Sequence, residues 1–149
     1  MVRDGIYYSV GFGLTGLLVS FWLGMSTAVP LFAGGAFCLY FFRDPDRSIP
    51  SGPVAVSPAD GRVTHIRDLG DGACRVSVFL NIFDVHVNRI PVSGVVTSVE
   101  YQRGSFKLAH LAAASTQNEQ NSLTIEDGAT RVTVKQIAGL IARRILCDK

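Results

Sequence analysis

An uninterrupted apolar segment near the N-terminus constrains this chain more than any other feature. Residues 5–42 contain no Asp, Glu, Lys, Arg or His. A single membrane span needs about 20 apolar residues, so a segment of this length fits two short tilted helices better than one long rod. The residues from Gly24 to Thr27, together with Pro30, favour a break between them. The sequence therefore predicts an N-terminal transmembrane helical hairpin, a membrane anchor over residues 1–42.

The residues that flank this segment predict its orientation. Aromatic rings, which prefer the membrane interface, lie near the ends of the two halves, at Tyr7, Tyr8, Trp22 and Tyr40. Cationic side chains flank the outer ends, at Arg3, Arg43 and Arg47. By the positive-inside rule both outer ends face the cytoplasm. The segment is too long for a signal peptide's apolar region, and the alternative is a buried helical pair in a soluble core.

Charge and cysteine content exclude several classes of protein. The formal net charge is +2, and the 14 Lys and Arg residues are scattered, so there is no dense basic stripe for nucleic acid. The three cysteines, Cys38, Cys74 and Cys147, form no Cys-x-x-Cys and no even framework. This indicates a reducing compartment and no structural metal. We expect a protein of the cell membrane whose remaining domain faces the cytoplasm.

From residue 54 onward the pattern changes to a period of two. Short segments rich in Val, Ile and Thr predict strands at residues 54–56, 62–66, 75–80, 94–101, 122–126, 131–136 and 141–146. The turns Gly70-Asp-Gly72 and Asp127-Gly128 predict hairpins between them. Residues 106–114 could form a short helix, followed by a polar loop over residues 115–121. The predicted fold class is mainly β: a small β sandwich or barrel-sandwich-like domain over residues 43–149.

Two titratable side chains are candidates for acid–base chemistry. Asp60 follows Pro58-Ala59, and a type I turn alone would explain an Asp at that place. His86 lies among β-branched residues, where a histidine that donates to a backbone carbonyl is the common case. His65 and His110 are weaker candidates. There is no His-Glu-x-x-His motif, Gly-rich phosphate loop or Ser-His-Asp order.

Five ordered blocks carry a resemblance to a known family. They are Tyr-Phe-Phe-Arg-Asp-Pro-Asp-Arg at residues 40–47, Val-Ser-Pro-Ala-Asp-Gly-Arg-Val at 56–63, Phe-Leu-Asn-Ile-Phe-Asp-Val-His-Val-Asn-Arg-Ile-Pro at 79–91, Asn-Glu-Gln-Asn-Ser-Leu at 118–123 and Gln-Ile-Ala-Gly-Leu-Ile-Ala-Arg-Arg-Ile at 136–145. Together they resemble the smaller bacterial form of phosphatidylserine decarboxylase. The preceding apolar segment also looks like that family's membrane anchor.

The resemblance implies an activity, a cofactor and partners. It implies a lyase of phospholipid biosynthesis that converts membrane-borne phosphatidylserine to phosphatidylethanolamine and carbon dioxide. The family's proenzyme, a zymogen, cuts itself at a Gly-Ser bond, and the serine becomes a pyruvoyl group on a small subunit. The ketone of that group serves as an electron sink for the decarboxylation. The oligomeric state stays open, with a homo-oligomer among the assemblies compatible with the sequence.

The resemblance also implies roles for three residues of this chain. Asp60 matches the aspartate of Pro-Ala-Asp-Gly, which serves self-cleavage. His86 matches a histidine that can return a proton to the substrate carbon after carbon dioxide leaves. Arg89 stands where larger members carry a second histidine. Because a guanidinium is not a base at physiological pH, Arg89 is expected to bind the substrate phosphate or carboxylate.

The C-terminal end of the sequence departs from the family pattern. The family's Gly-Ser pair lies beyond the last of the five blocks, and the sequence given ends at Lys149. Gly104-Ser105 stands in a different context and is interpreted as an ordinary loop. The expectation is that the pyruvoyl serine is absent from this chain, which would then be a fragment or a truncated gene product with an incomplete β domain, inactive by itself.

A second class of function stays open on the sequence alone. Short strands with Gly-rich turns also suit a membrane-tethered barrel-sandwich module that binds partners as an adaptor and performs no chemistry. A carrier module of this kind would present a lysine at a tight hairpin tip. Neither Lys107 nor Lys135 occupies such a tip in the predicted arrangement.

Overall fold

The computed structural model describes residues 2–107, 114–128 and 130–147. The chain divides into two compact units, each assembled from separate stretches of sequence. The first unit comprises Met1–Ser48, Ala59–Arg62 and Leu80–Asn88. The second comprises Ile49–Pro58, Val63–Phe79 and Arg89–Lys149. The anchor over residues 1–42 and the β domain over residues 43–149 stay predictions.

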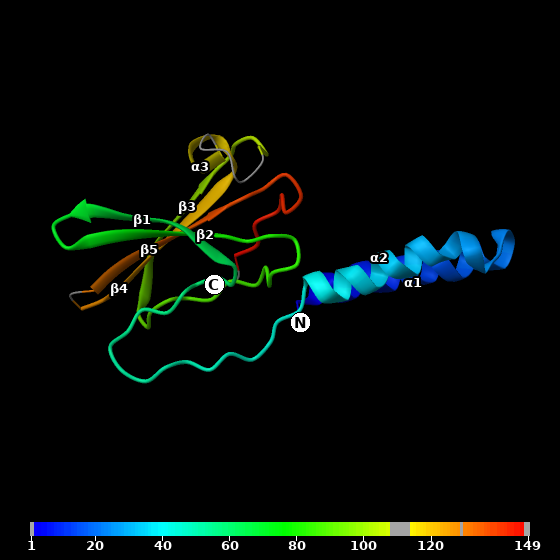
Figure 1. Cartoon of the computed structure of the whole chain (residues 1–149), viewed down its shortest axis with the longest axis horizontal. Coiled ribbons are helices and arrows are strands. Elements are labelled where there is room, and N and C mark those ends of the chain that lie inside the picture. Colours follow the sequence, from blue (N-terminus) through cyan, green and yellow to red (C-terminus); the bar gives the residue numbers. More distant parts are fainter. Residues whose placement is uncertain (1, 108–113, 129, 148–149) are drawn as a thin grey trace. The chain divides into compact units, whose positions relative to one another are not determined.

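Two apolar helices, α1 (Arg3–Leu23) and α2 (Met25–Phe41), lie side by side in the first unit (Figure 1). They are joined at Gly24, whose φ of +88° is a conformation that side chains with a Cβ rarely adopt. The predicted break near Gly24 is confirmed. Pro30 does not contribute to it, because Pro30 lies inside α2. A proline there removes only one intrahelical hydrogen bond, and the neighbouring turns continue the helix.

Small residues let the two helices approach each other. A Cβ added at Gly16 of α1 would lie 2.8 Å from the Phe32 ring of α2. One added at Gly35 would lie 3.4 Å from both the Phe12 side chain and the Ser9 carbonyl oxygen. The outer ends of the pair are also linked, since the Val2 amide donates to the carbonyl of Phe42 at 3.1 Å. Close contact through glycines is a common way for apolar helices to pack.

The surface of the helical pair is strongly apolar. Large side chains of α1 remain exposed, including Leu14, Leu18 and Phe21, which is 81% exposed. Within the described residues, α1 is the one helix long and apolar enough to cross a membrane, with 21 residues and a mean hydropathy of 1.5. With 17 residues, α2 is shorter. By length and composition alone, this is a weak indication of membrane association.

The second unit is mainly β, with five strands in two antiparallel sheets among its described residues. One sheet pairs β1 (Arg62–Gly70) with β2 (Ala73–Phe79), and the other has the order β3 (Val95–Gln102), β4 (Gln120–Asp127), β5 (Thr130–Ile137). The two hairpin predictions are confirmed. Asp71 and Gly72 connect β1 to β2, both at positive φ, and Asp127 pairs with Thr130 across the turn from β4 to β5.

Two predicted strands are wrong. Residues 54–56 form no strand: the Val54 amide bonds locally to the carbonyl of Gly52, and the Val56 amide bonds to the carbonyl of Pro91, which belongs to no strand. Residues 141–146 form no strand either. There the Arg143 amide bonds to the carbonyl of Ile141, so the backbone turns back on itself. Alternating apolar residues do not make a strand where no partner strand lies beside them.

The polar stretch over residues 115–121 is also not the predicted loop. It contains the end of the short helix α3 (Ala114–Gln117) and the start of β4. Asn118, between them, is fully buried. Its side-chain amide donates to the carbonyls of Lys107 and Ala138, both at 2.8 Å, and its oxygen accepts from the Lys107 amide at 2.9 Å. The short helix predicted over residues 106–114 falls mostly on residues 108–113, outside the described residues.

The Gly16 contact with Phe32 generates the first prediction. Gly16→Leu should lower the thermal unfolding midpoint of the helices in detergent micelles, because the new side chain overlaps the Phe32 ring and forces α1 and α2 apart. Circular dichroism at 222 nm measures the midpoint. Gly13→Leu is the matched control, since a Cβ at Gly13 has no heavy atom within 4 Å. Equal midpoints for the two variants would contradict the packing described here.

Candidate functional site

The candidate histidine, His86, is held between a ring and a carbonyl. Its ring stacks on Phe41, the last residue of α2, with centroids 4.2 Å apart and an interplanar angle of 28°. Its Nδ1 lies 3.0 Å from the backbone oxygen of Asp84. Because a carbonyl can only accept, this hydrogen bond requires the proton on Nδ1, which leaves Nε2 of the neutral ring as the basic atom.

A tight turn fixes the backbone ahead of His86. The Asp84 carboxylate accepts from both the backbone amide and the side-chain amide of Asn81, at 2.8 and 2.7 Å. The Asn81 side-chain oxygen in turn accepts from the Phe83 amide at 2.8 Å. Val85, between Asp84 and His86, is buried. The carboxylate of Asp84 is thus used to shape the turn, and its carbonyl orients the histidine.

Tyr40, near the end of α2, and Arg43, just after it, also hold this turn. Arg43 donates to the Phe83 carbonyl at 2.7 Å, and the Tyr40 hydroxyl donates to the same oxygen at 3.2 Å. The Arg43 guanidinium also lies over the Tyr40 ring, 3.9 Å from its centroid. The sequence identified both residues as membrane-flanking groups. Their contact with Phe83, some 40 residues away, had no local signal in the sequence.

The candidate carboxylate, Asp60, pairs with Arg47. The Arg47 Nη2 atom lies 3.3 Å from Asp60 Oδ1 and donates to the carbonyl of Val87 at 3.3 Å. The Asp60 side chain is 42% exposed and that of Arg47 is 28% exposed. Val87 directly follows His86, so Arg47 connects the two candidate residues within one unit. Among the described contacts, no hydrogen bond joins Asp60 to His86 directly.

The remaining candidates lie elsewhere. Arg89 belongs to the second unit, where its side chain is exposed and its amide donates to the carbonyl of Pro58 at 2.8 Å. His65 is exposed on β1. His110 lies outside the described residues. In the described part of the chain, no group of three His, Cys, Asp or Glu side chains could hold a metal ion.

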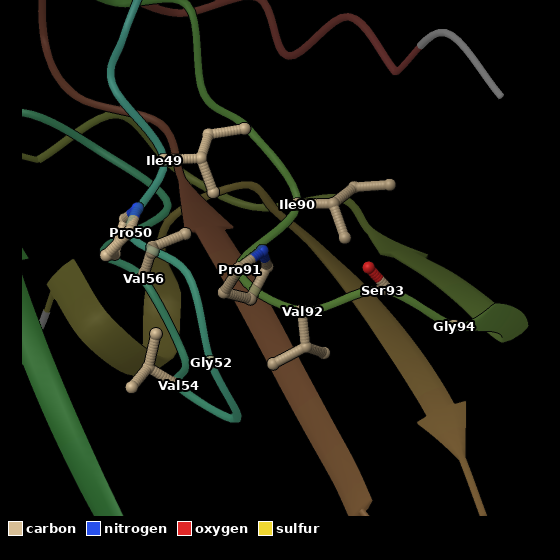
Figure 2. Close-up of a pocket in the computed structure, with 10 residues that line it drawn as sticks. All are labelled: Ile49, Pro50, Gly52, Val54, Val56, Ile90, Pro91, Val92, Ser93 and Gly94. Carbon is tan, nitrogen blue, oxygen red and sulfur yellow. The ribbon is translucent and has the colours of Figure 1, made fainter.

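An apolar hollow of about 420 Å³ lies in the second unit (Figure 2). Its walls come from two segments of chain that the Val56 to Pro91 hydrogen bond ties together. The lining residues are Ile49, Pro50, Gly52, Val54, Val56, Ile90, Pro91, Val92, Ser93 and Gly94. Because no titratable side chain lines this hollow, it offers apolar contact and no acid–base group.

One titratable group of the second unit has a shifted pKa. The pKa of Tyr101 is raised above its usual value, first because its hydroxyl hydrogen-bonds to Glu119 and also because that carboxylate repels the phenolate. Tyr101 lies on β3, in the second unit. The shift therefore belongs to the sheet and does not identify a catalytic group.

Comparisons with known proteins agree with the sequence blocks. The family model described as phosphatidylserine decarboxylase matches residues 35–149, a range that contains Asp60, His86 and Arg89. A phosphatidylserine decarboxylase proenzyme of Solibacter usitatus is 52% identical over 149 residues, covering 100% of this chain and 72% of that protein. Proenzymes of the same name from Syntrophus aciditrophicus and Cupriavidus taiwanensis are 46% and 45% identical, with 99% of this chain and 73% and 72% of those proteins covered.

Proposed function

The chain belongs to the phosphatidylserine decarboxylase family, and we propose that it acts as a carboxy-lyase that converts phosphatidylserine to phosphatidylethanolamine in phospholipid biosynthesis. The observation that carries this function is the match of the whole chain to the Solibacter usitatus proenzyme. The arrangement around His86 supports it. It offers an imidazole with Nε2 as its basic atom and, in the same unit, an ion-paired carboxylate, two groups suited to acid–base steps.

His86 acts on the substrate carbon. When the carboxylate leaves as carbon dioxide, its bonding electrons stay on that carbon, which then takes up a proton. His86 Nε2 is suited to carry this proton, because Nδ1 is occupied with the Asp84 carbonyl and Phe41 holds the ring plane. Arg89 binds the phosphate or carboxylate of the substrate through its guanidinium.

Asp60 serves the self-cleavage that the name proenzyme indicates for the relatives. A carboxylate can accept the proton of a serine hydroxyl as that oxygen attacks the preceding peptide bond. The Arg47 guanidinium, whose Nη2 lies 3.3 Å from Asp60 Oδ1, holds this carboxylate in place.

The proenzyme name is consistent with a pyruvoyl cofactor, and Ser105 does not fit as its source. The Ser105 amide and hydroxyl both donate to the carbonyl of Gln117, at 2.7 and 3.0 Å, and its carbonyl accepts from Glu119 at 3.0 Å. A Cβ at Gly104 would lie 2.5 Å from the backbone of Asn118. The Gly104–Ser105 peptide bond is thus part of a packed contact with residues 117–119. The pyruvoyl group of the proposed enzyme therefore comes from another serine, on a small subunit.

The apolar helices α1 and α2 form a transmembrane hairpin in this proposal, with the β domain, of barrel-sandwich type, on the cytoplasmic side of the cell membrane. The exposed apolar faces of the pair and the arginines after α2 support this placement. Phosphatidylserine, a component of the bilayer, then reaches the site without leaving the membrane surface. A homo-oligomer is compatible with this arrangement.

The function is tested with full-length protein, meaning the proenzyme that also carries the small-subunit segment with the pyruvoyl serine. The substrate is supplied as vesicles of phosphatidylserine labelled in the serine carboxyl group. Release of labelled carbon dioxide, with matching appearance of phosphatidylethanolamine, supports the decarboxylase. Binding of the protein to vesicles without any release would instead favour the adaptor module. The His86→Ala variant is the matched inactive control for this assay.

Replacing His86 should remove the chemistry and keep the fold. His86→Ala should lower the decarboxylation rate by about 10² or more, because the carbon that loses carbon dioxide then lacks its proton carrier. The rate is measured on protein that has already been processed into two chains. Near-parental turnover by processed His86→Ala protein would exclude this role. His65→Ala, on an exposed position of β1, serves as the control.

Replacing Asp60 should block self-cleavage, the step that precedes decarboxylation. Asp60→Asn keeps the size of the side chain but cannot accept the proton that self-cleavage must move, so uncut precursor should accumulate. A denaturing gel of freshly purified protein shows the one-chain and two-chain forms. Normal two-chain processing of Asp60→Asn would contradict the assignment.

Membrane attachment should depend on the apolar face of α1. The double substitution Leu14→Arg with Leu18→Arg places two charges on one side of this helix and should move the protein from washed membranes into the soluble or aggregated fraction. Immunoblots of the two fractions after alkaline washing give the distribution. Ile66→Arg, at an exposed position of β1, should leave the protein with the membranes.

A further inference from the structure

Arg47 contacts two segments that are distant in the sequence. A single nitrogen, Nη2, lies 3.3 Å from Asp60 Oδ1 and 3.3 Å from the carbonyl of Val87. The two acceptors belong to the turn before β1 and to the segment that carries His86. The guanidinium therefore fixes the carboxylate relative to the backbone directly after the histidine.

An ordinary surface ion pair does not account for this arrangement. Exposed pairs contribute little to stability, roughly 0–1 kcal/mol. Here the Arg47 side chain is only 28% exposed, and its Nη1 atom is buried without a hydrogen-bond partner among the described residues. An unsatisfied buried donor costs free energy, so this contact is a poor choice for stability alone.

Arg47 shares the task of holding the His86 segment with a second arginine. Arg43 already donates to the Phe83 carbonyl at 2.7 Å, assisted by Tyr40. What Arg47 adds is the link to Asp60, which Arg43 does not contact in the described structure. The two arginines, four residues apart, thus have different tasks within the same unit.

We propose that Arg47 is the positioning residue for the self-cleavage step, holding the Asp60 carboxylate in a fixed place relative to the His86 segment. The inference rests on the proposed function, because it assigns to Arg47 a part in the proenzyme's processing. An arginine suits this task better than a lysine, since the planar guanidinium fixes the directions of the two N–H donors on Nη2, while the donors of an ammonium rotate freely.

The test uses full-length Arg47→Ala, Arg47→Lys and parental protein. Arg47→Ala should slow self-cleavage at least about tenfold, because the Asp60 carboxylate loses its cation and its fixed place. The decarboxylation rate per processed molecule should change less than about threefold, since His86 keeps its contacts with Phe41 and Asp84. Arg47→Lys should recover part of the cleavage rate, and millimolar methylguanidinium should recover part of it for Arg47→Ala. Arg67→Ala, at an exposed position of β1, is the matched control and should cleave at the parental rate.

Each result bears on the inference. Parental cleavage by Arg47→Ala overturns it, and so does a loss of cleavage that follows a lowered thermal midpoint and resists both lysine and methylguanidinium. Hydrogen exchange gives a readout without activity: Arg47→Ala, but not Arg67→Ala, should speed exchange at residues 86–88, and unchanged exchange there overturns the link through Val87. Parental protein that processes itself but releases no carbon dioxide would overturn the proposed decarboxylation while leaving the Arg47 result intact.

Discussion

The carbonyl groups of the segment that carries His86 need hydrogen-bond donors, and the rest of the candidate site depends on how they are supplied. This segment is neither helix nor strand, so it has no ladder of backbone partners. The donors come from side chains at the end of α2 and just after it. Arg43 and Tyr40 satisfy Phe83, and Arg47 satisfies Val87. One short stretch of chain thereby orders a segment about 40 residues away and places the histidine.

A similar solution appears in the second unit, where the fully buried Asn118 satisfies the backbone at Lys107 and Ala138. In both places a polar side chain replaces the regular pairing that the backbone lacks. Removing Asn118 would leave the carbonyl of the buried Ala138 without this donor, which costs free energy.

These polar contacts also explain what could be predicted from the sequence. The helix break at Gly24 and the strands β1 to β5 follow from local pattern and turn chemistry, and both were confirmed. Residues 54–56 and 141–146 had the same alternating pattern but found no partner strand. Arg43 and Arg47 were identified as membrane-flanking charges, because nothing local reveals that their acceptors lie at Phe83 and Val87. Asp60 and His86 were selected through the family resemblance, and their roles stay predictions.

The position of Phe41 connects the helices with the chemistry. It is the last residue of α2, and its ring stacks directly on His86. A shift or rotation of the end of α2 would therefore move the Phe41 ring that packs against the imidazole of His86. With α2 anchored in a bilayer, as proposed, the helix end and the histidine would be fixed at one depth relative to the lipid surface. The stacking of Phe41 on His86 thus gives a physical reason why the helices and the histidine belong to one compact unit.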